Sequence, residues 1–277
     1  MSTASPAPSV PSAGPRAFCA ADADGGVSIE LALPEAADRR SCLLLRRHAK
    51  QAQDEVRLPL AELPGGRLRA ELPVGTALRE GRWDVYLVLD DEEPVRVLPG
   101  MNDLRALLDR EAHKVEGKLR VRIPYPAKEG HLAVRAWQRG PHAEAGELHI
   151  GEGRLTLQGR LLGAEFGEEA DLLADLRGSA EPPVTVEVKV SGDEFTATVP
   201  YRKLGPGLWD LRLRPSGAQG PRVRVGRLLD DVADKKPVFR YPSSRVTGEY
   251  GPVEAEPYYT VDNDLSVKVQ ACEEETA

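Results

Sequence analysis

Short segments in which apolar and polar residues alternate make up most of this chain. In its first half they lie at residues 27–33, 43–45, 56–60, 68–72, 83–89, 95–97, 119–123 and 132–136. A period of two is typical of a strand that buries one face, and Pro, Gly and charged residues separate the segments as turns do. One short helix is predicted over residues 104–108, with Asn102 as its N-cap. Because no pair of long amphipathic helices could cover a parallel sheet, we expect an all-β, antiparallel fold.

The second half of the chain repeats this order. LREGRWDVYL at 78–87 and LGPGLWDLRL at 204–213 share the pattern Leu-x-x-Gly-x-Trp-Asp and place Trp83 and Trp209 126 residues apart. Segments 155–157, 184–188, 195–200 and 223–225 match 29–31, 56–60, 68–73 and 95–97, and the Pro-Tyr pair at 124–125 recurs at 257–258, 133 residues later. Because the offset changes so little over a whole unit, the pattern predicts a tandem duplication.

Short strands at this spacing predict two tandem immunoglobulin-like antiparallel β-sandwich domains related by internal duplication. In such folds an aromatic residue near the start of a late strand fixes the corner of the domain. We expect Gly81 and Gly207 to allow the turn and the indoles of Trp83 and Trp209 to fill the core below it, while the following aspartates face the other way. We expect a disordered Pro/Ser/Ala tail at residues 1–16, a first sandwich at 17–137 and a polar linker at 138–147. A second sandwich at 148–270 and an acidic tail at 271–277 follow.

Charge and composition exclude several classes of function. The net charge of −7 and a pI near 5.4 disfavour nucleic acid as a partner. No apolar run approaches the ~20 residues that span a bilayer, so we expect no transmembrane segment. The first 16 residues lack the charged and apolar regions of a secretory signal, and we expect a cytoplasmic protein. Frequent Arg, Ala, Gly and Pro with scarce Lys, Ile and Asn indicate a GC-rich, actinobacterial genome.

The residue types that usually carry catalysis or bind metals have no recognisable spacing here. The 3 cysteines are widely spaced without a CxxC pair and favour reduced thiols, with Cys42 inside an apolar strand. The 5 histidines show neither HxxxH nor HExxH spacing: His48, His113, His131, His142 and His149. Acidic segments at 90–93, 230–234 and 262–264 lack the twelve-residue calcium loop and indicate solvated turns. Nucleotide-binding glycine loops and the Gly-x-Ser-x-Gly motif are missing, so we expect no catalytic residue, metal or cofactor.

Arginines and tyrosines of the second unit form the most informative surface set. Alternation places Arg222 and Arg224 on the outer face of their strand. Guanidinium groups bind carboxylate or phosphate, and tyrosines stack on sugar rings or fill interfaces. The candidate binding residues are Arg222, Arg224, Arg227, Tyr241, Tyr258 and Tyr259. Ligand binding, a protein interface and a solvated face all stay open, because Arg96 repeats Arg224 in the first unit.

LWDLRLR, VRVGRLLDDVADK and YYTVDNDLSVKV, between about residues 207 and 269, carry a family resemblance that the first unit echoes more weakly. This part resembles the β-sandwich modules C-terminal to the catalytic part of actinobacterial family-two glycosyltransferases, which build teichoic-acid-like or capsular cell-envelope polymers. The resemblance implies an accessory module that oligomerises the enzyme or holds the polymer. The nucleotide-sugar domain with its Asp-x-Asp metal motif has no counterpart: the Asp-Asn-Asp at 262–264 lies near the C-terminus instead of after a Rossmann-like strand. No catalytic residue carries over.

We therefore expect a non-catalytic tandem β-sandwich accessory protein that binds or scaffolds in glycan or cell-envelope polymer biosynthesis. Its expected partners are a glycosyltransferase, a second copy of itself, or a glycan or anionic polymer. Two alternatives stay open. One is a transferase with a site in the interdomain groove or on the Arg/Tyr face, and the other is a plain homo-oligomeric structural protein.

Overall fold

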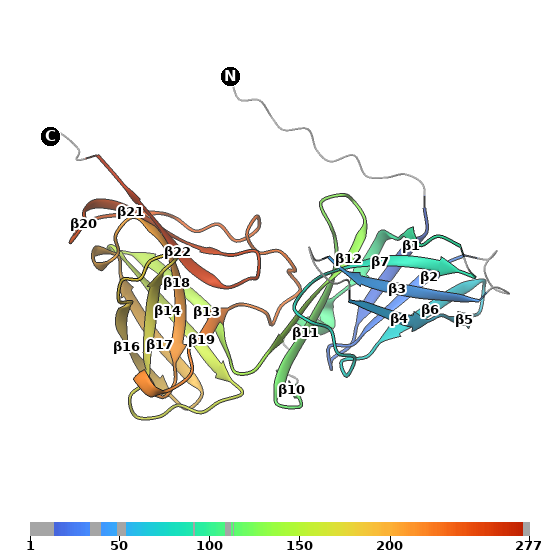
Figure 1. The fold of residues 1–277 in the computed structure, drawn as a ribbon, viewed down its shortest axis with the longest axis horizontal. Coiled ribbons are helices and arrows are strands. Elements are labelled where there is room, and N and C mark those ends of the chain that lie inside the picture. The colour runs from blue at the N-terminus through green and yellow to red at the C-terminus, as the bar shows by residue number, and fades with distance from the viewer. Residues whose placement is uncertain are drawn as a thin grey trace, which may run out of the picture. The chain divides into compact units, whose positions relative to one another are not determined.

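The structure is a computed structural model that describes residues 14–33, 40–48, 54–90, 92–108, 112 and 114–273. The regular elements of these residues are strands and short 3-10 helices, which confirms the expected all-β class. The chain divides into two compact units (Figure 1). The first contains residues 1–115, 120–138 and 229–233, and the second contains 116–119, 139–228 and 234–277.

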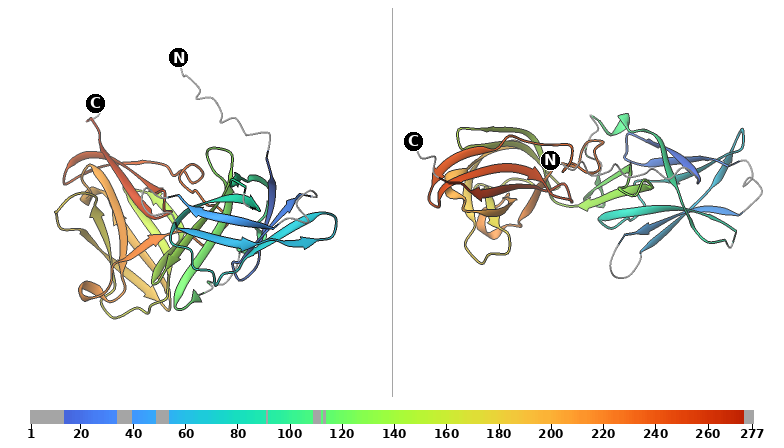
Figure 2. Two further views of the ribbon diagram at one scale, coloured as in Figure 1. Left: turned by 45° about the vertical axis from the view of Figure 1, so that its right-hand side comes forward. Right: turned by 90° about the horizontal axis from the view of Figure 1, so that it is seen from above.

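Two sheets form the first unit, as the views in Figure 2 show. One has the order β5 (Ala61–Leu63), β6 (Arg67–Leu72), β2 (Val27–Ala32), β1 (Arg16–Ala21) and β9 (Leu98–Asp103). The other has the order β10 (Lys114–Val115), β11 (Lys118–Pro126), β12 (Leu132–Arg139), β7 (Gly81–Leu89), β3 (Ser41–Arg47) and β4 (Glu55–Pro59), with β8 (Val95–Arg96) also beside β7. Inward residues of both sheets form one apolar cluster around Trp83.

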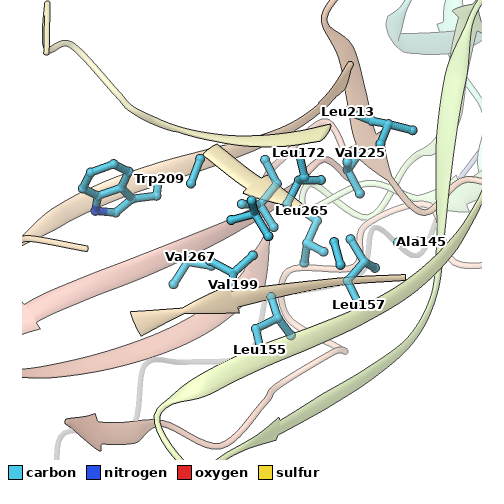
Figure 3. Close-up of a cluster of buried hydrophobic side chains, with 14 of the residues drawn as sticks. Ala145, Leu155, Leu157, Leu172, Val199, Trp209, Leu213, Val225, Leu265 and Val267 are labelled. Atoms are coloured by element: carbon cyan, nitrogen blue, oxygen red, sulfur yellow. The ribbon is translucent and has the colours of Figure 1, made fainter. Parts of the chain in front are cut away.

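The second unit has one continuous ten-stranded sheet that closes on itself in part. Its order is β15 (Asp171–Leu176), β16 (Val184–Ser191), β17 (Glu194–Pro200), β14 (Arg154–Leu162), β13 (His142–Gly151), β19 (Val223–Gly226), β18 (Gly207–Arg214), β22 (Leu265–Ala271), β21 (Gly251–Tyr259) and β20 (Ser244–Gly248). Because β15 also pairs with β18, the strands from β15 to β18 form a barrel. Figure 3 shows part of the core of this unit, with Trp209 at one side of a group of leucines and valines from several strands.

The strands that carry the two tryptophans, β7 and β18, have neighbouring strands arranged in the same way. β7 pairs with β3 along one edge, and β12 and β8 share the other edge. β18 pairs with β15 along one edge, and β22 and β19 share the other. Trp83 lies opposite Val134 of β12, and Trp209 lies opposite Val267 of β22. The spacing that the sequence repeats is thus also a repeated strand register.

One strand match differs from the sequence comparison. Leu72 pairs with Val27, and Val199, which the sequence matches to Leu72, pairs with Leu155. The strand registers therefore align segment 155–157 with 27–29 instead of 29–31. A shift of two residues leaves the same side chains pointing inward, so alternation could not detect it.

Each tryptophan follows a glycine turn and is held by the same contact. The side chains are buried, and the indole Nε1 donates to the carbonyl oxygen four residues earlier, at 3.0 Å in Trp83 and 2.8 Å in Trp209. Gly81 and Gly207 have φ of 137° and 149°, values that side-chain-bearing residues rarely adopt. Backbone and indole together define where each strand starts.

The short helix expected at 104–108 is wrong in extent. The helical turn covers only η2 (Arg105–Leu107), and Leu104 occupies its N-cap position. Asn102 lies in β9 and its Nδ2 donates to the carbonyl oxygen of Pro124 at 3.2 Å. Parallel pairing of β9 with β1 keeps the backbone extended through Asp103, so the helical turn begins only at Arg105.

Strands occupy most of the expected linker at 138–147, because β12 extends to Arg139 and β13 begins at His142. Two of its polar residues, His142 and Glu144, have partners within the fold. The buried His142 lies 2.7 Å from Glu144, whose carboxylate accepts the Leu228 N–H at 2.9 Å. Strands likewise include Arg16 and Ala271, which we assigned to the tails; residues 1–13 and 274–277 lie outside the described residues.

Replacing Trp209 with Ala is expected to destabilise the second unit by roughly 3 to 5 kcal/mol, because a buried aromatic side chain is lost. Hydrogen exchange of the full-length protein measures this loss in peptides from residues 139–228. Trp83→Ala is the matched variant and lowers protection in peptides of the first unit. A loss below about 1 kcal/mol in the Trp209 variant contradicts the role of the indole.

Gly207→Ala is expected to cost about 2 to 3 kcal/mol, because φ of 149° is strained for alanine and the new Cβ would lie 2.5 Å from Leu176 Cδ1. Gly192→Ala is the control: its φ is 63°, nothing lies within 4 Å of a Cβ there, and the expected cost is about 1 kcal/mol. The same hydrogen-exchange measurement compares them. Equal losses would show that the turn at Gly207 imposes no special constraint.

Candidate functional site

A hollow of about 220 Å³ lies on the second unit, where β18 and β19 meet the turn between β21 and β22. We call it the arginine–aspartate hollow, because these two residue types dominate its lining. The lining residues are Arg177, Asp210, Leu211, Arg212, Arg224, Thr260, Val261, Asp262, Asp264 and Leu265.

The alternation of β18 determines which side chains reach this surface. Leu211 and Leu213 are buried, whereas Asp210, Arg212 and Arg214 point to the other side. Together with the outward residues of β15 and β19 they form what we call the charged face: Asp171, Asp175, Asp210, Arg212, Arg214 and Arg224.

Two arginines of the charged face, Arg212 and Arg214, have carboxylate partners on the neighbouring strand β15. Arg214 Nε donates to Asp171 at 2.6 Å, in direct cross-strand register. Arg212 Nε lies 3.1 Å from Asp175 Oδ2. Opposite charges on adjacent strands stabilise the sheet, and they also neutralise one another's field.

Asp210 is one of the three carboxylates that line the hollow. It accepts hydrogen bonds from Arg177 Nε at 3.2 Å and Ser266 Oγ at 2.8 Å. Burial by itself would raise the pKa of Asp210, but these hydrogen bonds and the nearby guanidinium charges lower that pKa below its usual range. The hydrogen bond from Arg177 in turn raises the pKa of that guanidinium. Both groups are therefore charged at neutral pH.

The wall of the hollow is the turn at 260–264. Thr260 Oγ1 accepts the N–H groups of Asp262 and Asp264, both at 3.2 Å, and Thr260 N–H donates to the carbonyl oxygen of Asp264 at 2.8 Å. Arg139, with a side chain 3% exposed, donates from Nη1 to Asp264 at 2.5 Å. Arg224 Nη1 lies 3.5 Å from the other oxygen of this carboxylate. Asp264 is thus fixed from both sides.

The six predicted binding residues lie in two different environments. Arg224 lines the hollow, Arg222 lies beside it with Nη1 3.2 Å from Asp175, and the ring of Tyr258 is 6.0 Å from Lys236 Nζ. The other three belong to an aromatic cluster around Phe239: Arg227, Tyr241 and Tyr259.

Tyr259 is part of the core of the second unit. Its side chain is fully buried, its ring centroid lies 5.8 Å from that of Phe239, and burial raises the pKa of its hydroxyl. Arg227 lies over Phe239 with its guanidinium 5.2 Å from the ring centroid. Because strand residues alternate, Tyr258 and Tyr259 point to opposite faces, and only Tyr258 is partly exposed.

Sequence reasoning missed Arg177, Asp210 and Asp175 as members of this surface. DLLADL at 171–176 was not interpreted as a strand, although its apolar pattern matches the strand at 41–47 in the first unit. With that strand in place, the outward Asp175 and the adjacent Arg177 follow. Asp210 was predicted to face outward, but nothing in the sequence indicated its partners.

The corresponding position of the first unit has different chemistry. Asp84 is buried against Arg82 Nε at 2.7 Å and Arg96 Nη2 at 3.3 Å. Tyr86 stands where the second unit has Arg212, and the guanidinium of Arg96 lies 5.1 Å from the centroid of its ring. Asp210 and Arg224 of the lining thus have the same residue types at the matching positions of the first unit, Asp84 and Arg96, whereas Arg212 is replaced by Tyr86.

Across the described ranges, no group of three or more His, Cys, Asp and Glu side chains is arranged to hold a metal ion. A search of the same ranges finds no helix with the length and apolar character needed to cross a membrane.

No family model and no curated protein matches the chain. Among solved structures it is similar to residues 217–571 of TarS from S. aureus, with 16% identity, a TM-score of 0.34 and coverage of 68% of this chain and 56% of that one. It is also similar to a pullulanase from Anoxybacillus sp. LM18-11 complexed with maltotriose, with 14% identity, a TM-score of 0.25 and coverage of 85% of this chain and 27% of that one. For a marsupial T cell receptor the identity is 9%, the TM-score is 0.26, and the coverage is 93% of this chain and 92% of that one. This chain thus spans little more than half of the TarS fragment. Identities and scores this low carry no argument about function.

The pKa of Asp210 is expected to rise when either of its donors is removed. Ser266→Ala and Arg177→Gln each delete a hydrogen bond to the charged form, and carboxyl-carbon NMR titration of the full-length protein follows the midpoint. Because the folded-state pKa is depressed, this pairing stabilises the fold above the unfolded pKa of about 3.9 and is lost as pH falls through the folded value. A wild-type midpoint at or above about 3.9 contradicts the assignment.

Proposed function

We propose that this chain is a non-catalytic accessory protein that binds or scaffolds in glycan or cell-envelope polymer biosynthesis. Its two units would have arisen by duplication of one immunoglobulin-like domain, with the second closed in part into a barrel. The repeated neighbours of β7 and β18 and the matched registers of Trp83 and Trp209 support a common origin. The resemblance of residues 207–269 to glycosyltransferase-associated modules supports the glycan setting.

The arginine–aspartate hollow is the observation on which this function rests. Guanidinium groups supply N–H donors and carboxylates supply acceptors, so the lining offers both partners that the hydroxyl and charged groups of a polymer need. A catalytic acid or base works best with a pKa near the working pH. Pairing with Arg177 lowers the pKa of Asp210, and pairing with Asp210 raises the pKa of Arg177, so both values lie far from neutral pH. This favours binding over proton transfer.

The partners in this proposal follow from the same surface. A polymer fragment would occupy the hollow, and a glycosyltransferase or a second copy of the chain would be the scaffolded protein. Tyr258 and Arg222 lie outside the lining and would contribute at its margin, whereas Tyr259 would act through the core.

Arg224→Gln is expected to weaken binding of a glycan or polymer fragment by about tenfold, or about 1.4 kcal/mol, because one charged donor of the hollow is lost. Calorimetry of the full-length protein against a panel of glycan and cell-envelope polymer fragments measures this. The control is Arg154→Gln, whose guanidinium pairs with Glu152 outside the lining. Turnover of a sugar donor by the purified protein, abolished by Arg224→Gln, would instead support a transferase.

A further inference from the structure

We infer that the arginine–aspartate hollow binds the hydroxyl groups of an uncharged sugar ring and not the charged groups of an anionic polymer. The inference rests on the proposed function, and it names the chemical class of ligand for the same site.

The charges that line the hollow are balanced. Three arginines and three aspartates contribute: Arg177, Arg212, Arg224, Asp210, Asp262 and Asp264. Each of the arginines has a carboxylate within 3.5 Å, two of them from aspartates of the lining and one from Asp175. An anion bound here would approach these carboxylates and would have to displace one of them from its guanidinium. Breaking such a pair leaves a charge without its partner, which is costly for partly buried groups.

A sugar hydroxyl meets no such conflict. Each hydroxyl has one donor and two acceptor sites, so it can accept from a guanidinium N–H while it donates to the carboxylate of the same ion pair. Hydrogen bonds to charged groups are stronger than those between neutral groups, and neighbouring hydroxyls on a ring can use both members of a pair at once. The paired state of Arg177 and Asp210 thus serves an uncharged ligand without rearrangement.

The hollow is also pre-organised and small. Arg139 and Arg224 hold Asp264 from opposite sides, and Thr260 fixes the backbone of the turn, so little ordering would accompany binding. Val261, 64% exposed, adds apolar surface at the turn for the C–H groups of a ring. A volume of about 220 Å³ lies below the roughly 300–1,000 Å³ of pockets for drug-sized ligands. This size fits a single ring.

To test this inference, the full-length protein is titrated with two sets of probes at 50 and 500 mM NaCl, and binding is measured from the changes in its NMR chemical shifts. Methyl glucoside, methyl galactoside and methyl N-acetylglucosaminide are the uncharged probes, and glucuronic acid and oligomeric glycerol phosphate are the anionic ones. We expect at least one uncharged probe to shift resonances of the hollow with a Kd that changes less than about twofold with salt. We expect the anionic probes to bind at least tenfold more weakly.

Two variants localise the effect. Asp210→Asn removes a charged acceptor of the hollow and is expected to weaken binding of the uncharged probe at least tenfold. Asp171→Asn removes a carboxylate of the charged face outside the hollow and is expected to leave its Kd unchanged. The comparison of probes and of salt in the wild-type protein needs no variant, so it holds even if Asp210→Asn fails to fold.

The possible failures are distinguishable. The inference is overturned if an anionic probe binds the hollow more tightly than every uncharged one, if its affinity falls steeply with salt, and if that affinity rises in Asp210→Asn. The proposed function would still stand in that case. If neither set of probes shifts the resonances of the hollow, the binding site itself is absent and the proposed function fails with it.

Discussion

One buried indole at the start of a strand constrains each unit of this protein. In β18, Trp209 occupies the core, its Nε1 is bound to the carbonyl oxygen of Gly205, and Gly207 supplies the backbone conformation that precedes it. Because strand side chains alternate, an inward Trp209 makes Asp210 and Arg212 point outward. A register shift of one residue would exchange the core face and the charged face. The chemistry of the surface therefore depends on the packing of the core.

The charged face illustrates how a protein keeps many arginines on one sheet without a strong field. Arg214 pairs with Asp171, and Arg212 pairs with Asp175 on the adjacent strand. Near the turn at 260–264 the pairing continues through Asp264, which the nearly buried Arg139 holds in place. The result is a surface rich in hydrogen-bonding groups and nearly neutral in charge. We propose that this combination is what a glycan ligand uses.

The all-β class and most strands could be predicted from the sequence, because a period of two and the turn residues between segments are local signals. The repeated Leu-x-x-Gly-x-Trp-Asp pattern also located the two strands that carry Trp83 and Trp209. Two kinds of feature could not be read in this way. The strands within 138–147 could not be read from the sequence because a polar side chain there, Glu144, has its partner far along the chain, in the N–H of Leu228. The helix expected after Asn102 was wrong because β1 draws residues 98–103 into a parallel pair.

The candidate site was predictable only in part, and for the same reason. Arg222 and Arg224 were located by alternation, but the carboxylates that face them lie on other strands and on the turn at 260–264. Tyr259 was predicted at the surface beside Tyr258, but the structure places its side chain in the core. The most direct test of the account is hydrogen exchange of the full-length protein with and without a bound glycan fragment. The account predicts added protection confined to peptides that cover residues 207–214 and 258–266; protection elsewhere, with these peptides unchanged, would contradict it.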